Sequence, residues 1–167
     1  MDRYLLLQIR KLVGRAHLLD RLMLHIAKYG PQWFFLGLGL AILLRGGLGL
    51  QAALTAVVAA TATRGANEVI GRVYRRDRPF VREAYEPLLW HRPSFSFPSN
   101  HAACGFALAV AVFLFLPAYG VALLVLASLL AFSRVYVGVH YPADVTFGAG
   151  IGSGVAWVIA WFASMIY

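Results

Sequence analysis

Long apolar segments, with the charged residues outside them, are the feature that most limits the fold of this chain. Four or five such segments follow one another, over 31–44, 48–63, 102–116, 118–132 and 145–167. Hydrophobic residues make up 60% of the 167 residues and charged residues only 13%, as is typical of integral membrane proteins. A spanning helix needs ~20 residues, so the shorter segments must recruit flanking residues to cross a bilayer. We therefore predict an all-α, polytopic membrane helix bundle of about five to six helices.

The length of the chain predicts a single domain over residues 1–167. In residues 1–29, basic residues alternate with leucines, which predicts an amphipathic helix or helix pair lying in the membrane interface. An ordinary first spanning helix is the alternative for this region. Gly30-Pro31 then punctuates the chain, and we expect the transmembrane bundle to occupy residues 30–167, with a polar loop over 72–100.

The net charge of +8 raises the possibility of nucleic-acid binding. The arginines, however, lie between apolar runs instead of following one polar face. Such charges inside a membrane protein need partners, because a charge at bilayer depth is expensive and usually functional. The sequence therefore favours anionic lipid or phosphate as the partner, with membrane lipids around it, and no nucleic acid.

The string PSNH at 98–101 stands directly before an apolar run. Ser99 is predicted to be the N-cap of that helix, and His101 falls in its first turn. A helix N-terminus offers free backbone N–H groups and a favourable dipole for an anion. We expect the Ser99 hydroxyl and the amides of Asn100 and His101 to hold phosphate oxygens. In the alternative interpretation Ser99 only caps the helix and His101 lies at the interface.

The string SRVYVGVHYPAD at 133–144 combines an imidazole with a carboxylate. Proline is favoured at the first helical position, so Pro142 places Asp144 about one turn inside a helix and His140 just outside it. Asp144 can then reach back, much as in a capping box, toward one nitrogen of the His140 ring. The other nitrogen would be unprotonated and able to attack. The alternative is that Asp144 only caps the helix.

The string RDRPF at 76–80 supplies a third part. Arg78 precedes Pro79 and is therefore expected in extended backbone, from which its planar guanidinium can bind two phosphate oxygens. Arg134 stands just after the apolar segment 118–132 and adds a second guanidinium. If the apolar segments alternate in direction, the three strings meet at one surface. Most of the neighbouring arginines are expected to face headgroups or solvent; they are Arg72, Arg75, Arg76 and Arg82.

In this order and spacing the three strings resemble the signature of the type 2 phosphatidic acid phosphatase superfamily. These are metal-independent lipid phosphatases related in fold to vanadium haloperoxidases and glucose-6-phosphatase. The family usually has a lysine seven residues before Arg78, where this chain has Gly71, and Arg72 or Arg75 would have to replace it. Within the family, the chain resembles the bacitracin-resistance (BcrC) type of undecaprenyl-diphosphate phosphatase.

The resemblance implies a role for each matching residue. His140 would attack phosphorus and form a phosphohistidine, Asp144 would orient it, and His101 would protonate the leaving oxygen. The phosphate oxygens would be held by polar side chains from the three strings, namely Arg78, Ser99, Asn100, Arg134 and Arg72. Neither a metal nor another cofactor is expected. The family also implies a multi-pass protein of the cell membrane with an extracytoplasmic site, although the positive-inside rule would place the loop 72–100 in the cytoplasm.

Four functions remain open at this stage. The first is hydrolysis of a polyprenyl diphosphate, undecaprenyl diphosphate to undecaprenyl phosphate, in the recycling of the lipid carrier of cell-wall synthesis and in bacitracin resistance. The second is the same chemistry on phosphatidylglycerophosphate or phosphatidate. The third is a component of an anion transporter, which has against it too few helices for the usual internal repeat. A purely structural membrane protein is the last.

Overall fold

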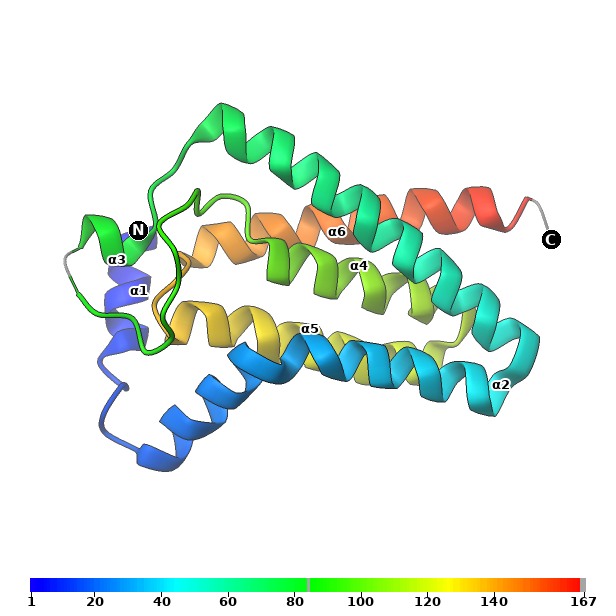
Figure 1. Ribbon diagram of the computed structural model, residues 1–167, viewed down its shortest axis with the longest axis horizontal. Helices are drawn as coiled ribbons and strands as arrows, with labels where there is room; N and C mark the ends of the chain where they lie inside the picture. The colour runs from blue at the N-terminus through cyan, green and yellow to red at the C-terminus, as the bar shows by residue number, and fades with distance from the viewer. Residues whose placement is uncertain (84, 166–167) are drawn as a thin grey trace.

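The structure, a computed structural model, describes residues 1–83 and 85–165, and these form an elongated helix bundle (Figure 1). The elements are α1 (Asp2–Arg10), α2 (His17–Tyr74), α3 (Pro79–Arg82), α4 (Asn100–Phe115), α5 (Pro117–Tyr136) and α6 (Pro142–Ala163). The described part of the chain contains no strand. The predicted all-α bundle of five to six helices is confirmed.

Helix α2 consists of two arms that meet at Gly46. This residue has a φ of 56° and a ψ of −127°, a backbone conformation open to glycine because it has no Cβ. The arms meet at the right-hand end of Figure 1 and separate toward the left-hand end. The predicted apolar segments 31–44 and 48–63 lie one in each arm.

The predicted boundary at Gly30-Pro31 is wrong, because α2 continues through Pro31 without ending. A proline inside a helix removes one hydrogen bond to the residue four positions earlier, here Ala27. The carbonyl of Ala27 instead accepts a hydrogen bond from Nη1 of Arg134, at 3.2 Å, so the freed group is satisfied from another helix. Residues 17–29 therefore belong to the first arm of α2, and only α1 remains as a separate N-terminal helix.

Among the described residues, three helices, α2, α5 and α6, are long and apolar enough to cross a membrane, and α4 is apolar but shorter. Helix α4 packs against all three of them. The small residues of α6 allow the closest approach: a Cβ on Gly148 would lie 2.8 Å from the carbonyl oxygen of Ser99, and one on Gly152 would overlap the carbonyl of Ala103. The GAGIGSG stretch at 148–154 thus permits close helix contact.

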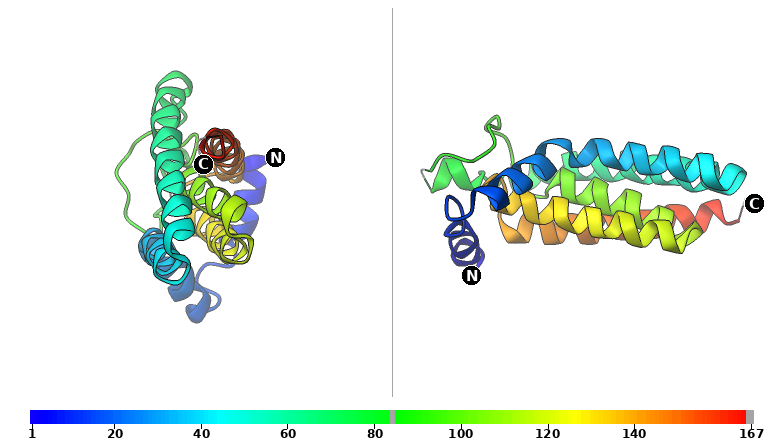
Figure 2. Two further views of the ribbon diagram at one scale, coloured as in Figure 1. Left: turned by 90° about the vertical axis from the view of Figure 1, so that its right-hand side faces the viewer. Right: turned by 90° about the horizontal axis from the view of Figure 1, so that it is seen from below.

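All the polar strings lie at one end of the bundle. There α2 and α5 end and α4 and α6 begin, so the convergence expected from alternating helices is present (Figures 1 and 2). Helix α1 lies across this end, as the right-hand view of Figure 2 shows. Its Leu6 is fully buried in a cluster that contains Ala102, Val135 and Tyr141. The N-terminal helix is therefore packed onto the end of the bundle that carries the polar strings.

Candidate active site

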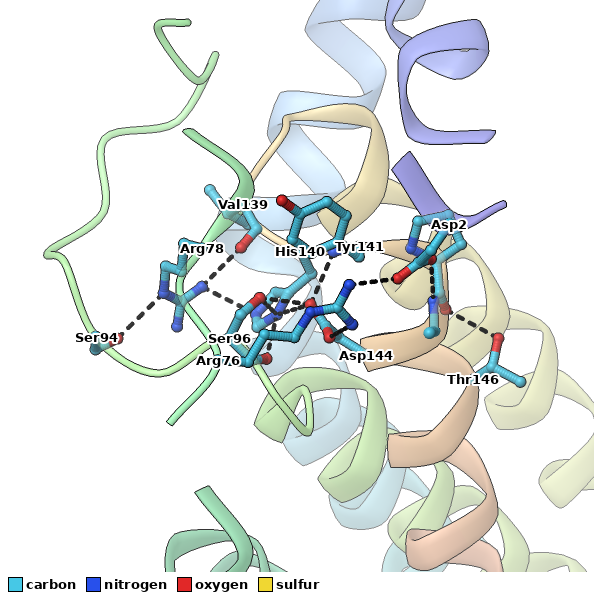
Figure 3. Close-up of polar contacts among 12 residues, drawn as sticks. Asp2, Arg76, Arg78, Ser94, Ser96, Val139, His140, Tyr141, Asp144 and Thr146 are labelled. Atoms are coloured by element: carbon cyan, nitrogen blue, oxygen red, sulfur yellow. Dashed lines mark hydrogen bonds and ion pairs between the residues drawn. The ribbon is translucent and has the colours of Figure 1, made fainter. Parts of the chain in front are cut away.

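Arg78 is buried and belongs to a hydrogen-bonded cluster (Figure 3). Its backbone is extended, with a φ of −70° and a ψ of 151°, as predicted for a residue before proline. Its Nε donates to Oγ of Ser94 at 3.1 Å and its Nη1 to the carbonyl oxygen of Val139 at 2.9 Å. The same Nη1 lies 3.1 Å from Nε2 of His140. The guanidinium therefore connects the loop before α4 with the turn before α6 through hydrogen bonds to both.

The partners of His140 determine its tautomer. Nδ1 lies 2.9 Å from the carbonyl oxygen of Ser96, which can only accept, so Nδ1 carries the proton. Nε2 faces a guanidinium of Arg78, which can only donate, so Nε2 presents its lone pair. The pKa of His140 is lowered to about 4, chiefly by burial; Asp144 opposes this change, and the guanidinium groups of Arg78 and Arg134 add to it. The ring is therefore neutral at physiological pH, with Nε2 unprotonated.

Asp144 is fully buried and lies in the first turn of α6. Its Oδ2 accepts from the backbone N–H of Tyr141 at 2.8 Å, as in a capping box. The same oxygen accepts a short hydrogen bond from the hydroxyl of Ser96. Nδ1 of His140 lies 3.7 Å from Oδ2, farther than the Ser96 carbonyl. Ser96 thus stands between the acid and the imidazole, a contact that the sequence analysis missed.

Arg76 lies inside this cluster, contrary to the expectation that it faces headgroups or solvent. Its Nη1 is 2.7 Å from Oδ1 of Asp144 and its Nη2 is 2.6 Å from Oδ2 of Asp2. The other oxygen of Asp2 accepts from the backbone N–H of Ala143 at 2.9 Å. The guanidinium also stacks over the ring of Tyr141, 4.1 Å from its centroid. Helix α1 is thereby connected to Asp144 through Arg76.

Arg134 and Ser99 carry buried polar atoms with no hydrogen-bond partner among the described residues. Arg134 is 1% exposed; apart from Nη1, which binds Ala27, its Nε and Nη2 are unpaired. Ser99 is the N-cap of α4, as predicted, but its hydroxyl makes no capping hydrogen bond and is also unpaired. Because buried donors are almost always satisfied in proteins, these atoms indicate a place for an acceptor such as an oxyanion.

Asn100 lies between two cavities. The first, of about 620 Å³, is lined by Arg78 and Asn67, and Nδ2 of Asn67 donates to Oδ1 of Asn100 at 3.0 Å. The second, of about 320 Å³, is lined mainly by apolar side chains and is reached by His101. His101 is in the first turn of α4, as predicted. Asn100 lines both cavities, so a polar compartment and an apolar one adjoin at the start of α4.

The structure does not bring Arg72 into this cluster. Its side chain is 72% exposed and pairs with Glu68, one turn earlier in α2, at 3.2 Å. Gly71 lines the polar cavity, and the next residue along a helix points about 100° away from it. Arg75 is exposed and donates to the carbonyl oxygen of Arg72 at 3.0 Å. Neither arginine considered as a replacement for the lysine at position 71 therefore reaches the site.

The chemistry available is that of an anion site with a nucleophile. Two buried guanidinium groups, Arg78 and Arg134, act on the same imidazole, whose unprotonated Nε2 faces Arg78. Guanidinium groups favour phosphate and carboxylate oxygens. The residues described, 1–83 and 85–165, include no group of three His, Cys, Asp or Glu side chains placed to hold a metal ion.

Comparison with known proteins identifies the family. The sequence profile of the PAP2 superfamily matches residues 51–166. The undecaprenyl-diphosphatase BcrC of Bacillus subtilis is 35% identical over 79% of this chain and 70% of its own length. The bacitracin transport permease protein BcrC of Bacillus licheniformis is 32% identical over 87% and 72%. The crystal structure of the PAP2-type phosphatidylglycerolphosphate phosphatase of Bacillus subtilis superposes with a TM-score of 0.72 at 26% identity, covering 99% of this chain and 86% of that one. The chain therefore belongs to the PAP2 superfamily and is a multi-pass membrane phosphatase.

Proposed function

We propose that this protein hydrolyses undecaprenyl diphosphate to undecaprenyl phosphate. The observation that carries the proposal is the neutral imidazole of His140, whose lone pair on Nε2 faces a buried guanidinium of Arg78. Two relatives bear the name BcrC, and one of them is named an undecaprenyl-diphosphatase. This activity would return the lipid carrier of cell-wall synthesis to its monophosphate form, and it would thereby lower sensitivity to bacitracin.

In the first half of the reaction, Nε2 of His140 attacks the terminal phosphorus. The new N–P bond forms as the bond from phosphorus to the bridging oxygen breaks, and the electron pair stays on that oxygen. The proton stays on Nδ1, which donates it to the Ser96 carbonyl, and Asp144 stabilises the positive charge that develops on the ring. The equatorial oxygens are held by the guanidinium groups of Arg78 and Arg134, the hydroxyl of Ser99 and the amide of Asn100.

The second half of the reaction removes phosphate from the enzyme. His101, which gave a proton to the departing oxygen in the first half, now accepts one from the attacking water. The water oxygen bonds to phosphorus, the N–P bond breaks, and the electron pair returns to Nε2 of His140. The products are undecaprenyl phosphate and inorganic phosphate, and no step uses a redox partner.

A second candidate substrate is phosphatidylglycerophosphate, because the phosphatase of that name shares the fold over nearly the whole chain. The two substrates differ in their leaving groups. A diphosphate expels a phosphate monoester, which is already a stable anion near neutral pH, whereas a lipid monophosphate expels an alkoxide that must be protonated. His101→Ala should therefore slow hydrolysis of monophosphates about 10²–10⁴-fold, and hydrolysis of diphosphates far less.

The proposed location of the site is the extracytoplasmic side. The loop 72–100 is rich in arginine, but Arg76 and Arg78 are used inside the site, so their charges need not report orientation. Ser94→Cys in the exposed part of this loop, with Cys104 replaced by alanine, gives a test in intact cells. A membrane-impermeant maleimide should label it from outside; labelling only after permeabilisation contradicts the proposal.

The test of function is the rate of phosphate release by purified protein on a panel of lipid diphosphates and monophosphates in EDTA. We expect undecaprenyl diphosphate to be the best substrate and vanadate to inhibit as a transition-state mimic. Brief exposure to phosphate-labelled lipid should give an acid-labile, base-stable phosphoprotein, absent in His140→Ala. Preference for phosphatidylglycerophosphate would favour the second candidate, and full activity of His140→Ala would remove this residue from the mechanism.

A further inference from the structure

Arg64 is an arginine within the apolar length of α2 that the site described so far does not use. It stands ten residues before Tyr74, the last residue of the helix, which is about 15 Å at 1.5 Å per residue. It is exposed, and no ion pair or hydrogen bond joins its side chain to another described residue. A charge at this depth in a spanning segment marks a functional position by default.

Two contacts between α2 and α4 determine the level of Arg64 in the bundle. Sγ of Cys104 lies 3.6 Å from the carbonyl oxygen of Ala60, and the side chains of Asn67 and Asn100 are hydrogen-bonded at 3.0 Å. Arg64 is four residues after Ala60 and three before Asn67, so all three lie on one face of α2. The level between these two contacts on α4 is that of His101.

Arg64 and His101 also line the same cavity, the apolar one of about 320 Å³. Its walls come from both arms of α2, through Phe34 and Val57, and from Cys104 and Leu108 of α4. The walls are mainly hydrocarbon; beside the arginine and the histidine, the polar side chains that line the cavity are those of Thr61, Asn100 and Cys104. At this size, near the lower limit of ligand pockets, the cavity holds only the first part of a long chain.

Two properties of the cavity thus agree with the leaving group of the proposed reaction. Undecaprenyl phosphate is an anion joined to an apolar chain, and the cavity has a cationic and imidazole end followed by an apolar body. The cavity also adjoins the polar compartment at Asn100, so a diphosphate can span the two with its terminal phosphate beside Arg78.

We propose that Arg64 binds the inner, lipid-linked phosphate of a lipid diphosphate, with the first part of the hydrocarbon chain in the apolar cavity beside it. Arg64 is then the residue that distinguishes diphosphates from monophosphates, since a monophosphate places its single phosphate beside Arg78 and leaves Arg64 only the chain. This inference depends on the proposed function and names the part of the site that recognises its substrate class.

Arg64 also has a simpler interpretation, in which its long side chain extends to bind the phosphate of any membrane lipid. In that case its removal affects all substrates alike. The two sources of phosphate, substrate and bulk lipid, are therefore separated by substrate selectivity.

The experiment compares Arg64→Gln with wild type on undecaprenyl diphosphate and undecaprenyl phosphate, in the same detergent, by phosphate release. Because hydrogen bonds to charged groups are the strong ones, we expect kcat/KM to fall about 10- to 100-fold on the diphosphate, and less than about threefold on the monophosphate. Arg64→Lys should recover part of the loss, since it keeps the charge but not the planar fork. Arg45→Gln is the matched control. Arg45 is likewise an exposed arginine of α2, but it lies beside Gly46, at the end of the bundle opposite the candidate active site.

A second measurement keeps the test valid where monophosphate turnover is too slow to measure. Inhibition by a polyprenyl methylene-diphosphonate should weaken in Arg64→Gln by the same factor as kcat/KM, while inhibition by the matching monophosphonate should not change. Thermal melting of each variant shows whether it is folded.

The outcomes separate this inference from the proposed function. Equal effects of Arg64→Gln on both substrates, or no effect on either, would overturn the role of Arg64 while the diphosphatase function stands. A wild-type protein that hydrolyses only monophosphates would overturn the proposed function itself. Arg45→Gln with the same selective loss would show that the effect comes from net charge instead of the cavity.

Discussion

Replacing Arg76 by glutamine tests how far activity depends on the ion pair that holds Asp144. Asp144 is fully buried, and Nη1 of Arg76 lies 2.7 Å from its Oδ1. After the substitution the carboxylate keeps the Ser96 hydroxyl and the Tyr141 N–H as donors. Removing one partner of a buried ion pair costs about 3–5 kcal/mol; because the Arg76 side chain is 29% exposed and water can partly replace it, we take the lower value. Because Asp144 must stay charged and in place to stabilise the ring in the transition state, we expect this loss to appear in kcat, and about 3 kcal/mol of transition-state stabilisation is about 100-fold in rate.

The assay is phosphate release from lipid diphosphate between pH 5 and pH 9. Without the guanidinium, protonation becomes the easier way to neutralise Asp144, so the acid limb of the rate profile should move to higher pH. The other charged or titratable groups facing Asp144 are His140 and Arg78, which the substitution leaves in place. Arg76→Lys should recover most of the activity.

Arg3→Gln is the matched control for this experiment. Arg3 lies on α1 and pairs with Glu83 at 2.6 Å, but it is 71% exposed and has no contact with Asp144, so its loss should change kcat less than about threefold. A folded Arg76→Gln protein that keeps more than a third of wild-type kcat, with an unmoved acid limb, would refute the reasoning. Ser96 and Tyr141 would then suffice to hold the carboxylate.

Four further changes have definite expected results. Asp2→Asn leaves the inner pair of Arg76 with Asp144 intact, so we expect a loss of kcat of about 3- to 10-fold, measured as above; a loss as large as that of Arg76→Gln would contradict this. Gly152→Ala forces a Cβ onto the carbonyl of Ala103, so the melting temperature in detergent should fall, whereas Gly154→Ala, with open space around it, should leave the melting temperature unchanged. The pKa of His140 is about 4 in the folded protein against an ordinary value of 6.5. Between these pH values the unfolded chain binds a proton that the folded protein does not. The free energy of unfolding should therefore fall by up to about 3 kcal/mol as the pH is lowered from 6.5 to 4. His140→Asn should melt with a weaker pH dependence there, and an unchanged dependence would place the titration elsewhere. Ser99→Ala should weaken inhibition by vanadate without lowering the melting temperature, because the hydroxyl makes no capping bond; a lower melting temperature would show that it does.

The elements of the fold could be predicted because each depends on local pattern. The apolar segments, the N-cap position of Ser99, the extended backbone of Arg78 and the first turn of α6 follow from residues within a few positions of one another. The boundary at Pro31 could not be predicted this way. The carbonyl that this proline leaves free is satisfied by Arg134, which is 107 residues from Ala27 in the sequence.

The polar contacts of the site likewise divide into those between residues near in the sequence, which could be predicted, and those between distant residues, which could not. The sequence predicts that His140 and Asp144 lie close together, because they are four residues apart at the start of one helix. The sequence predicts Arg76 at the headgroups or in solvent, because its contact with Asp144 depends on the loop conformation and its contact with Asp2, 74 residues away, depends on the packing of α1. Arg72 was assigned to the site by its nearness to Gly71, but the turn of the helix carries it to the outer face.

The hydrogen-bond acceptor that holds Nδ1 of His140 belongs to the main chain, and side-chain mutagenesis cannot reach it. Ser96→Ala deletes the hydroxyl that binds Asp144 yet leaves the carbonyl at 2.9 Å from the imidazole. An alanine scan of this loop would therefore measure the contribution of the Ser96 hydroxyl but not that of the Ser96 carbonyl. An ester in place of the peptide bond between Ser96 and Phe97, made by semisynthesis, would weaken that carbonyl as an acceptor without altering any side chain. The tautomer of the nucleophile thus depends on where the backbone places this carbonyl, which is present whatever amino acid is encoded at position 96.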